Sequence, residues 1–176
     1  MEQLNIVVFG FGGVGKSAST INFIGGNYVS NKDPTNYRIH TQMGSKEVVV
    51  DILDTPCGLF PLNAVESVRL GDGFIVMYSI TSNSSFLEVL ELVEQIKSAK
   101  NEDFFPLVIV GNKCDLEEDR QVKTDRGIQQ ASKLNASFFE TSAKFNINIT
   151  ETFQEVIRLI YRKRKEHTAK PNCVVN

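Results

Sequence analysis

Short, strongly apolar runs recur along this chain and alternate with stretches in which the apolar side chains are spaced differently. Several runs are continuously apolar, which is typical of parallel strands that are covered on both faces. Gly44 and Ser45 separate two of the runs, so these two form a predicted hairpin. The predicted strands are 5–10, 38–43, 47–53, 73–80, 106–112 and 136–142.

Between the strands, apolar side chains recur three and four residues apart, which places them on one face of a helix. The clearest series are Phe86, Leu90, Val93 and Ile96, and then Ile149, Phe153, Val156, Ile157 and Ile160. Alternating strands and helices predict right-handed βαβ units and a doubly wound α/β sheet. Such sheets bind ligands beyond the carboxyl ends of their strands, so polar motifs that follow strands are candidate sites.

Composition narrows the function classes. The chain has 176 residues, 41% of them apolar, which predicts one globular domain. Its cysteines, Cys57, Cys114 and Cys173, are scattered, which favours a reducing compartment over a disulfide framework or a zinc site. From Arg158 onward there are six Lys or Arg and one acid, although the net charge is −2. A basic tail suits an anionic surface, and the body lacks the basic-aromatic pattern of nucleic-acid binders.

A glycine-rich segment, "GFGGVGKS" at Gly10–Ser17, directly follows the first predicted strand. Glycines let a loop turn its N–H groups inward toward phosphate oxygens, and the helix that follows directs its positive end at the same anion. Lys16 adds a positive charge for the outer phosphates, and the Ser17 hydroxyl is a ligand for Mg²⁺. The segment therefore predicts a nucleotide phosphate site.

A second motif, "NKCD" at Asn112–Asp115, follows the strand at 106–112. The Asp115 carboxylate only accepts hydrogen bonds at neutral pH, and guanine offers it two adjacent donors. Adenine places an acceptor at the first of these positions, which would leave a buried carboxylate unpaired. The combination with the phosphate loop predicts a guanine nucleotide.

Five segments in order resemble the motifs of Ras-like small GTPases: "GFGGVGKS", "DPT" (33–35), "DILDT" (51–55), "NKCD" and "ETSAK" (140–144). The resemblance covers roughly residues 4–165. It implies a P-loop NTPase fold with a six-stranded, mostly parallel sheet and about five helices. The expected organisation is a Ras-like G domain at 1–165 and a flexible tail at 166–176.

The resemblance also implies roles for individual residues. The phosphates and a magnesium ion would be bound by Gly13, Val14, Gly15, Lys16, Ser17 and Ala18, with Thr35 and, through water, Asp54 as further Mg²⁺ ligands. The guanine base would be contacted by Tyr28, Asn112, Lys113, Asp115, Ser142, Ala143 and Lys144. The loop around Thr35 and the segment from Asp54 to about Ala64 would be two switches that the γ-phosphate orders.

The second switch departs from the family pattern Asp-x-x-Gly-Gln. Without a gap, Cys57 replaces the glycine and Gly58 the glutamine; with one inserted residue, Gly58 is the glycine and Leu59 replaces the glutamine. Both alignments lack the side chain that orients the attacking water. The sequence therefore predicts a GDP/GTP signalling switch with low intrinsic GTP hydrolysis. The alternative is a nucleotide-bound interaction module without useful turnover.

The first predicted switch and the C-terminal tail indicate which kinds of protein and membrane partners to expect. "NYRIH" after Thr35 is about three residues shorter than is usual in the Ras branch and lacks the acidic pair that meets basic effector domains. Effector and exchange-factor proteins are expected, but their identity does not follow from the family. The closing "CVVN" makes Cys173 a candidate for prenylation, which with the basic tail predicts the cytoplasmic face of a membrane.

Overall fold

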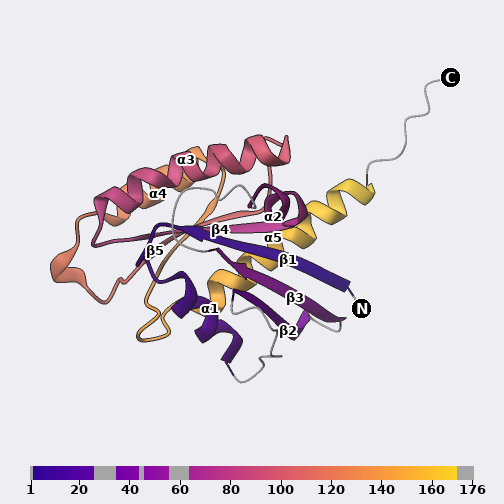
Figure 1. Cartoon of the computed structure of the whole chain (residues 1–176), viewed down its shortest axis with the longest axis horizontal. Helices are drawn as coiled ribbons and strands as arrows, with labels where there is room; N and C mark the ends of the chain where they lie inside the picture. Colours follow the sequence, from indigo (N-terminus) through magenta and orange to yellow (C-terminus); the bar gives the residue numbers. More distant parts are fainter. Residues whose placement is uncertain (1, 26–34, 44–45, 56–63, 170–176) are drawn as a thin grey trace.

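The computed structural model describes residues 2–25, 35–43, 46–55 and 64–169 (Figure 1). Six strands form one sheet in the order β2-β3-β1-β4-β5-β6, in which only β2 runs antiparallel to its neighbour. The strands are β1 Glu2–Gly10, β2 Asn36–Met43, β3 Lys46–Asp54, β4 Gly73–Ser79, β5 Leu107–Asn112 and β6 Ser137–Thr141. The predicted α/β class, the six strands and the β2–β3 hairpin are confirmed.

Five α-helices cover the two faces of this sheet (Figure 1). They are α1 Lys16–Ile24, α2 Ala64–Leu70, α3 Asn83–Lys100, α4 Thr124–Lys133 and α5 Ile149–Ala169, and a short 3₁₀ turn, η2, spans Glu117–Asp119. Alternate residues of β1 point to opposite faces, so Ile6 and Val8 join α1 and α5 in one core, while Val7 and Phe9 join α2, α3 and α4 in another. Two packed layers thus hold the central strands rigidly between them.

The predicted helical series on α3 and α5 are largely buried, but α4 left little trace in the sequence. Only Gly127 and Ala131 of α4 are buried, and neither marks an apolar stripe. The last helix, α5, continues to Ala169, whereas the sequence placed the start of the tail at 166. An i,i+4 ion pair between Arg162 and Glu166 supports these last turns. Within the described residues, no helix has the length and apolar content needed to cross a bilayer.

The sheet also fixes where ligands approach. The parallel strands β1, β3, β4, β5 and β6 end at one edge, at Gly10, Asp54, Ser79, Asn112 and Thr141. The segments "GFGGVGKS" and "NKCD" begin at the ends of β1 and β5, and "DILDT" and "ETSAK" run across the ends of β3 and β6. Residues far apart in the sequence are therefore carried to a common edge by strand register alone.

Candidate functional site

The phosphate loop connects β1 to α1. Gly15 has φ 103°, a left-handed conformation that a residue with a side chain rarely adopts, and it immediately precedes the helix. Among the described residues, no side chain caps the first turn of α1, whose N–H groups point out of the helix end toward the loop. A helix start of this kind, entered through glycines, attracts anions.

Lys16 is almost completely buried within this loop. Its ammonium group donates hydrogen bonds to the carbonyl oxygens of Gly10, at 2.8 Å, and Phe11, at 3.1 Å. The loop thus wraps around a positive charge. Val14, which was expected beside the phosphates, points its side chain into the core, and its backbone carbonyl belongs to the base site.

A cluster of oxygen atoms lies beside the loop, at the end of β3. The Ser17 hydroxyl donates to one carboxylate oxygen of Asp54, and the Asp54 N–H donates to the carbonyl of Thr35 at 2.8 Å. The other oxygen of Asp54 is buried and has no hydrogen-bond partner among the described residues. Burial raises the pKa of the Asp54 carboxyl, while the Ser17 hydrogen bond and the Lys16 charge lower it.

This cluster fits a magnesium ion. Mg²⁺ is bound through oxygen ligands, often one or two side chains together with phosphate and water. A hydroxyl and a buried carboxylate oxygen without a partner meet that description, so Ser17 and Asp54 would hold the ion, directly or through water. When bound, it would neutralise charge on the terminal phosphates of a nucleotide.

Asn112 connects three segments of the base site. Its amide nitrogen donates to the carbonyl of Val14 at 2.8 Å, and its amide oxygen accepts from the Thr141 hydroxyl at 2.9 Å and the Ala143 N–H at 3.3 Å. A Cβ atom added at Gly15 would overlap the Asn112 amide nitrogen. The phosphate loop and the base loops are therefore in direct contact.

Asp115 and Ser142 form the centre of the base site. The Ser142 hydroxyl donates to Asp115 Oδ1 at 2.6 Å and accepts from the N–H of Phe145 at 3.2 Å. Reciprocal backbone hydrogen bonds between Ser142 and Ile147 close the following loop. Because Ser142 holds one oxygen, the Asp115 carboxylate is fixed in orientation before any ligand arrives.

Lys113 and Lys144 flank this pair. Lys113 has φ 68°, which is strained for a lysine and keeps the backbone turning at this point. The Lys144 ammonium lies over the Phe145 ring, 5.1 Å from its centroid.

The structure brings most of the predicted site residues to one edge of the sheet. Gly13, Ser17 and Ala18 are exposed on the phosphate side. Asn112 links this loop to the base loops, because it is bonded to the Val14 carbonyl and to the Ala143 N–H. Five predicted positions lie outside the described residues: Tyr28, Cys57, Gly58, Leu59 and Cys173.

Three contributors were missed by the sequence analysis. Thr141 orients Asn112, Asn22 of α1 donates to the carbonyl of Ala143, and Arg120 binds the Glu140 side chain. Thr141 and Glu140 were visible only as parts of "ETSAK". Asn22 and Arg120 carry no local signal, because their partners are distant in the sequence.

The sheet order, the P-loop and the helices on both faces are those of a Ras-like P-loop NTPase. Residues 5–162 match the family model described as "Ras family", and the chain belongs to this family of small GTP-binding signalling proteins. It is 46% identical over 165 residues to Ras-like protein 1 of Saccharomyces cerevisiae, covering 91% of this chain and 53% of that protein. It is 44% identical over 175 residues to Ras-like protein 2 of Mucor circinelloides f. lusitanicus, covering 97% and 88%.

The chain thus spans about half the length of its yeast relative and most of the Mucor protein. Members of the family bind GTP and GDP with Mg²⁺, hydrolyse GTP, and interact with effector and exchange-factor proteins.

Proposed function

We propose that this chain is a guanine-nucleotide switch that binds GDP and GTP with Mg²⁺ and hydrolyses GTP slowly. The observation that carries the proposal is the Asp115–Ser142 pair, at 2.6 Å, beside Asn112. It presents a fixed carboxylate acceptor to a base, and guanine has two donors to satisfy it. Calorimetry with Mg²⁺ and nucleotide-stripped protein tests the proposal: GDP binds far more tightly than ADP, and equal affinities would contradict it.

The Thr35–Asp54 hydrogen bond supports a switching role. It joins the residue expected to sense the γ-phosphate to the start of the second switch, where residues 56–63 follow. A contact made by Thr35 with nucleotide and Mg²⁺ would therefore bear on both switches together. We infer that GTP favours one arrangement of this pair, in the manner of loops ordered by a γ-phosphate.

The sequence "DTPCGLF" from Asp54 onward supports slow hydrolysis. In-line attack requires a water held in a near-attack position, and neither alignment of this segment supplies a glutamine. Pro56 also removes an N–H and fixes the local backbone angle. We therefore expect turnover well below that of a relative with the glutamine.

A gain-of-function experiment tests this and selects the alignment. Single-turnover GTP cleavage is measured for the wild type, for Leu59→Gln, and for Cys57→Gly combined with Gly58→Gln. We expect one of the two to raise the rate at least about tenfold, since a positioned glutamine supplies water orientation. A wild-type rate that already equals that of glutamine-bearing relatives would refute slow hydrolysis.

The same segment favours one alternative function, a nucleotide-bound interaction module without useful turnover. Chromatography of the nucleotide extracted from freshly purified protein separates the two. Mostly GTP together with no measurable cleavage supports the module. A mixture with GDP, combined with measurable cleavage, supports the slow switch.

Membrane attachment and effector choice are further parts of the proposal. The basic end of the chain favours the cytoplasmic face of a membrane, and Cys173 is the candidate prenylation site. Intact-mass analysis after expression in a eukaryotic host tests the lipid, and an unmodified Cys173 would refute it. The short first switch should not support GTP-dependent capture by a typical Ras-binding domain.

A further inference from the structure

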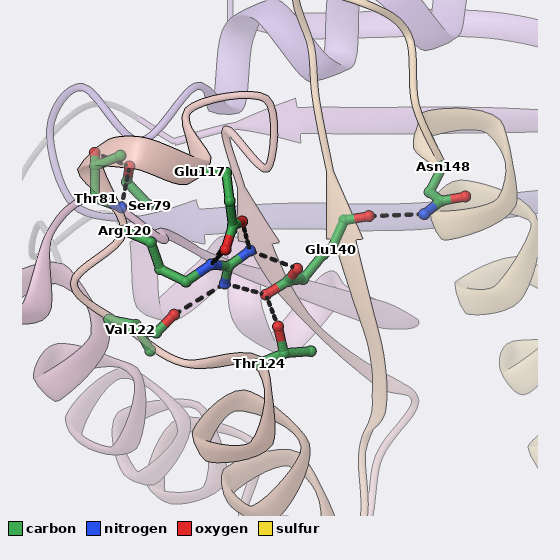
Figure 2. A network of polar contacts seen from close by, with 8 residues as sticks. All are labelled: Ser79, Thr81, Glu117, Arg120, Val122, Thr124, Glu140 and Asn148. Atoms are coloured by element: carbon green, nitrogen blue, oxygen red, sulfur yellow. Dashed lines mark hydrogen bonds and ion pairs between the residues drawn. The ribbon is translucent and has the colours of Figure 1, made fainter.

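A charged cluster joins the two elements that carry the base site (Figure 2). Arg120 follows η2 on the segment that continues from Asp115, and Glu140 lies on β6, two residues before Ser142. Figure 2 shows the Arg120 guanidinium between the side chains of Glu117 and Glu140, with Thr124 of α4 also directed at Glu140. The cluster does not include a residue assigned above to the nucleotide.

Every donor of the Arg120 guanidinium is used. The two terminal nitrogens meet the two oxygens of Glu140 at 2.7 and 3.0 Å, the bidentate arrangement that guanidinium and carboxylate favour. The remaining N–H groups meet Glu117 at 2.7 to 2.9 Å and the Val122 carbonyl at 2.9 Å. One side chain thus joins β6, η2 and the segment that leads into α4.

The bridge is shielded from solvent. The side chains of Arg120 and Glu140 are 13% and 18% exposed, whereas that of Glu117 is 70% exposed. The hydrogen bonds that Arg120 donates to Glu140 and Glu117 raise the pKa of its guanidinium. The buried Tyr78 hydroxyl nearby has its pKa raised by burial and also by the negative charge of Glu140. A charge in such surroundings depends on its partner more than a surface charge does.

The Arg120–Glu140 bridge lies next to the residues proposed to contact the base. Glu140 is followed by Thr141, which is bonded to Asn112, and by Ser142, which is bonded to Asp115. The carbonyl of Glu140 also accepts from Asn148 at 2.8 Å, which anchors the same strand end from the other side (Figure 2). Arg120 therefore sets the spacing between the loop of Asp115 and the loop of Ser142.

We propose that Arg120 is a positioning residue for the guanine base: its bridge to Glu140 keeps Asp115 and Ser142 in register and thereby lengthens the residence of the nucleotide. This rests on the proposed function. Loss of the bridge lets the two loops separate, so the Asp115 carboxylate loses its fixed orientation. Release of nucleotide then becomes faster, and the base is read less selectively.

The chain contains a matched control at the other end of β6. Arg158 of α5 makes two hydrogen bonds to Glu155, at 2.6 and 2.7 Å, and the Ser137 hydroxyl donates to the same carboxylate at 2.7 Å. The chemistry is that of Arg120, Glu140 and Thr124, but Ser137 begins the strand that leads to the base site at its far end. Arg158→Met removes a bidentate arginine–glutamate pair that is more exposed and lies within one helix, with Arg158 56% exposed, and it does not touch the base loops.

The experiment measures dissociation of GDP and of inosine diphosphate, which lacks the exocyclic amine, from the full chain with Mg²⁺. We expect Arg120→Met to release GDP about tenfold faster, Arg120→Lys to show a smaller change, and Arg158→Met to change less than twofold. The ratio of the inosine to the guanosine release rate should fall toward one in Arg120→Met. A merely structural loss would accelerate both ligands equally.

The release rates distinguish a failure of the positioning role from a failure of the proposed function. An unchanged ratio in Arg120→Met, with guanine preference intact in the wild type, overturns the positioning role alone. A wild type without guanine preference overturns the proposed function instead. If Arg120→Met does not fold, Arg120→Lys and Glu140→Gln carry the same two measurements, because both keep most of the side-chain volume.

Discussion

The two halves of the nucleotide site differ in how their polar groups are satisfied. In the base half, Asn112 makes three hydrogen bonds, and Ser142 holds Asp115. In the phosphate half, the Lys16 ammonium donates to carbonyl oxygens of its own loop, and within the part of the chain that the structure describes a buried oxygen of Asp54 has no partner. The polar groups of the base half are already hydrogen-bonded to one another. Those of the phosphate half would gain stronger partners from a bound phosphate and cation.

This difference indicates how affinity and selectivity are divided. Preformed hydrogen bonds cost nothing to arrange when the ligand arrives, so the base half suits discrimination. A lysine held by carbonyls and an unpartnered carboxylate oxygen gain the most from phosphate and a cation, so the phosphate half suits affinity. Four predictions test that division, beginning with the largest expected effect.

Asp115→Asn should invert base selectivity. An amide presents a donor where the carboxylate accepts, so guanine loses a partner and xanthine, with a carbonyl in place of the amine, gains one. The ratio of GDP to xanthosine diphosphate affinity should fall by up to about 10⁴, the range of sites built around a specific hydrogen bond. Calorimetry with both ligands checks this, and Asp125→Asn on the exposed surface of α4 is the control.

Lys16→Met should weaken affinity without changing selectivity. Hydrogen bonds from a charged donor contribute about 1.5 to 3 kcal/mol each, so GDP affinity should fall roughly a hundredfold. The ratio of GDP to ADP affinity should stay within about threefold of the wild-type value. Lys133→Met, at an exposed position near the end of α4, should change neither quantity. A large loss of base preference in Lys16→Met would contradict the division of roles.

Asp54→Asn should have opposite effects on the empty and the loaded protein. Burial raises the pKa of this carboxyl, so its charged form disfavours the ligand-free fold. Removing the charge should raise the free energy of unfolding of the nucleotide-stripped chain at neutral pH. It should also abolish the slowing of GDP release by Mg²⁺. Urea unfolding and release with and without EDTA measure both effects, with Asp103→Asn as the exposed control.

Cys114 should show the smallest effect, although it lies within the base motif. Burial first, and then the charges of Glu140 and Asp115, raise the pKa of its thiol. Its alkylation should therefore keep accelerating to a higher pH than the alkylation of an unperturbed thiol. Peptide mapping after iodoacetamide treatment follows this residue alone. Cys114→Ser should change the rate of GDP release less than twofold. A larger change would mean that the Cys114 side chain contributes to nucleotide binding.

The sequence was sufficient for those parts of the molecule that depend on local pattern. Continuous apolar runs predicted the strands, and the glycines with Lys16 predicted the phosphate loop, because each requires a particular residue type at a particular spacing. Helix α4 escaped because it buries only Gly127 and Ala131. The role of Arg120 was not predicted because a charged residue in a polar turn is ordinarily exposed to solvent.

The missed contacts share a physical cause. Arg120 and Glu140, like Asn22 and Ala143, become neighbours only when strands and helices pack, so nothing in either local sequence encodes the partner. The individual motifs were visible, but the hydrogen bonds that hold them relative to one another were not. Spatial relations of this kind require the folded chain.

The contact between Gly15 and Asn112 has a consequence for how substitutions would be felt. Because a methyl group at Gly15 would overlap the Asn112 amide, a larger residue there would displace the side chain that braces Thr141 and Ala143. A substitution in the phosphate loop would then reduce the discrimination between guanine and adenine. The absence of a Cβ atom at Gly15 leaves room for the Asn112 side chain, so the phosphate loop and the base loops both keep their positions.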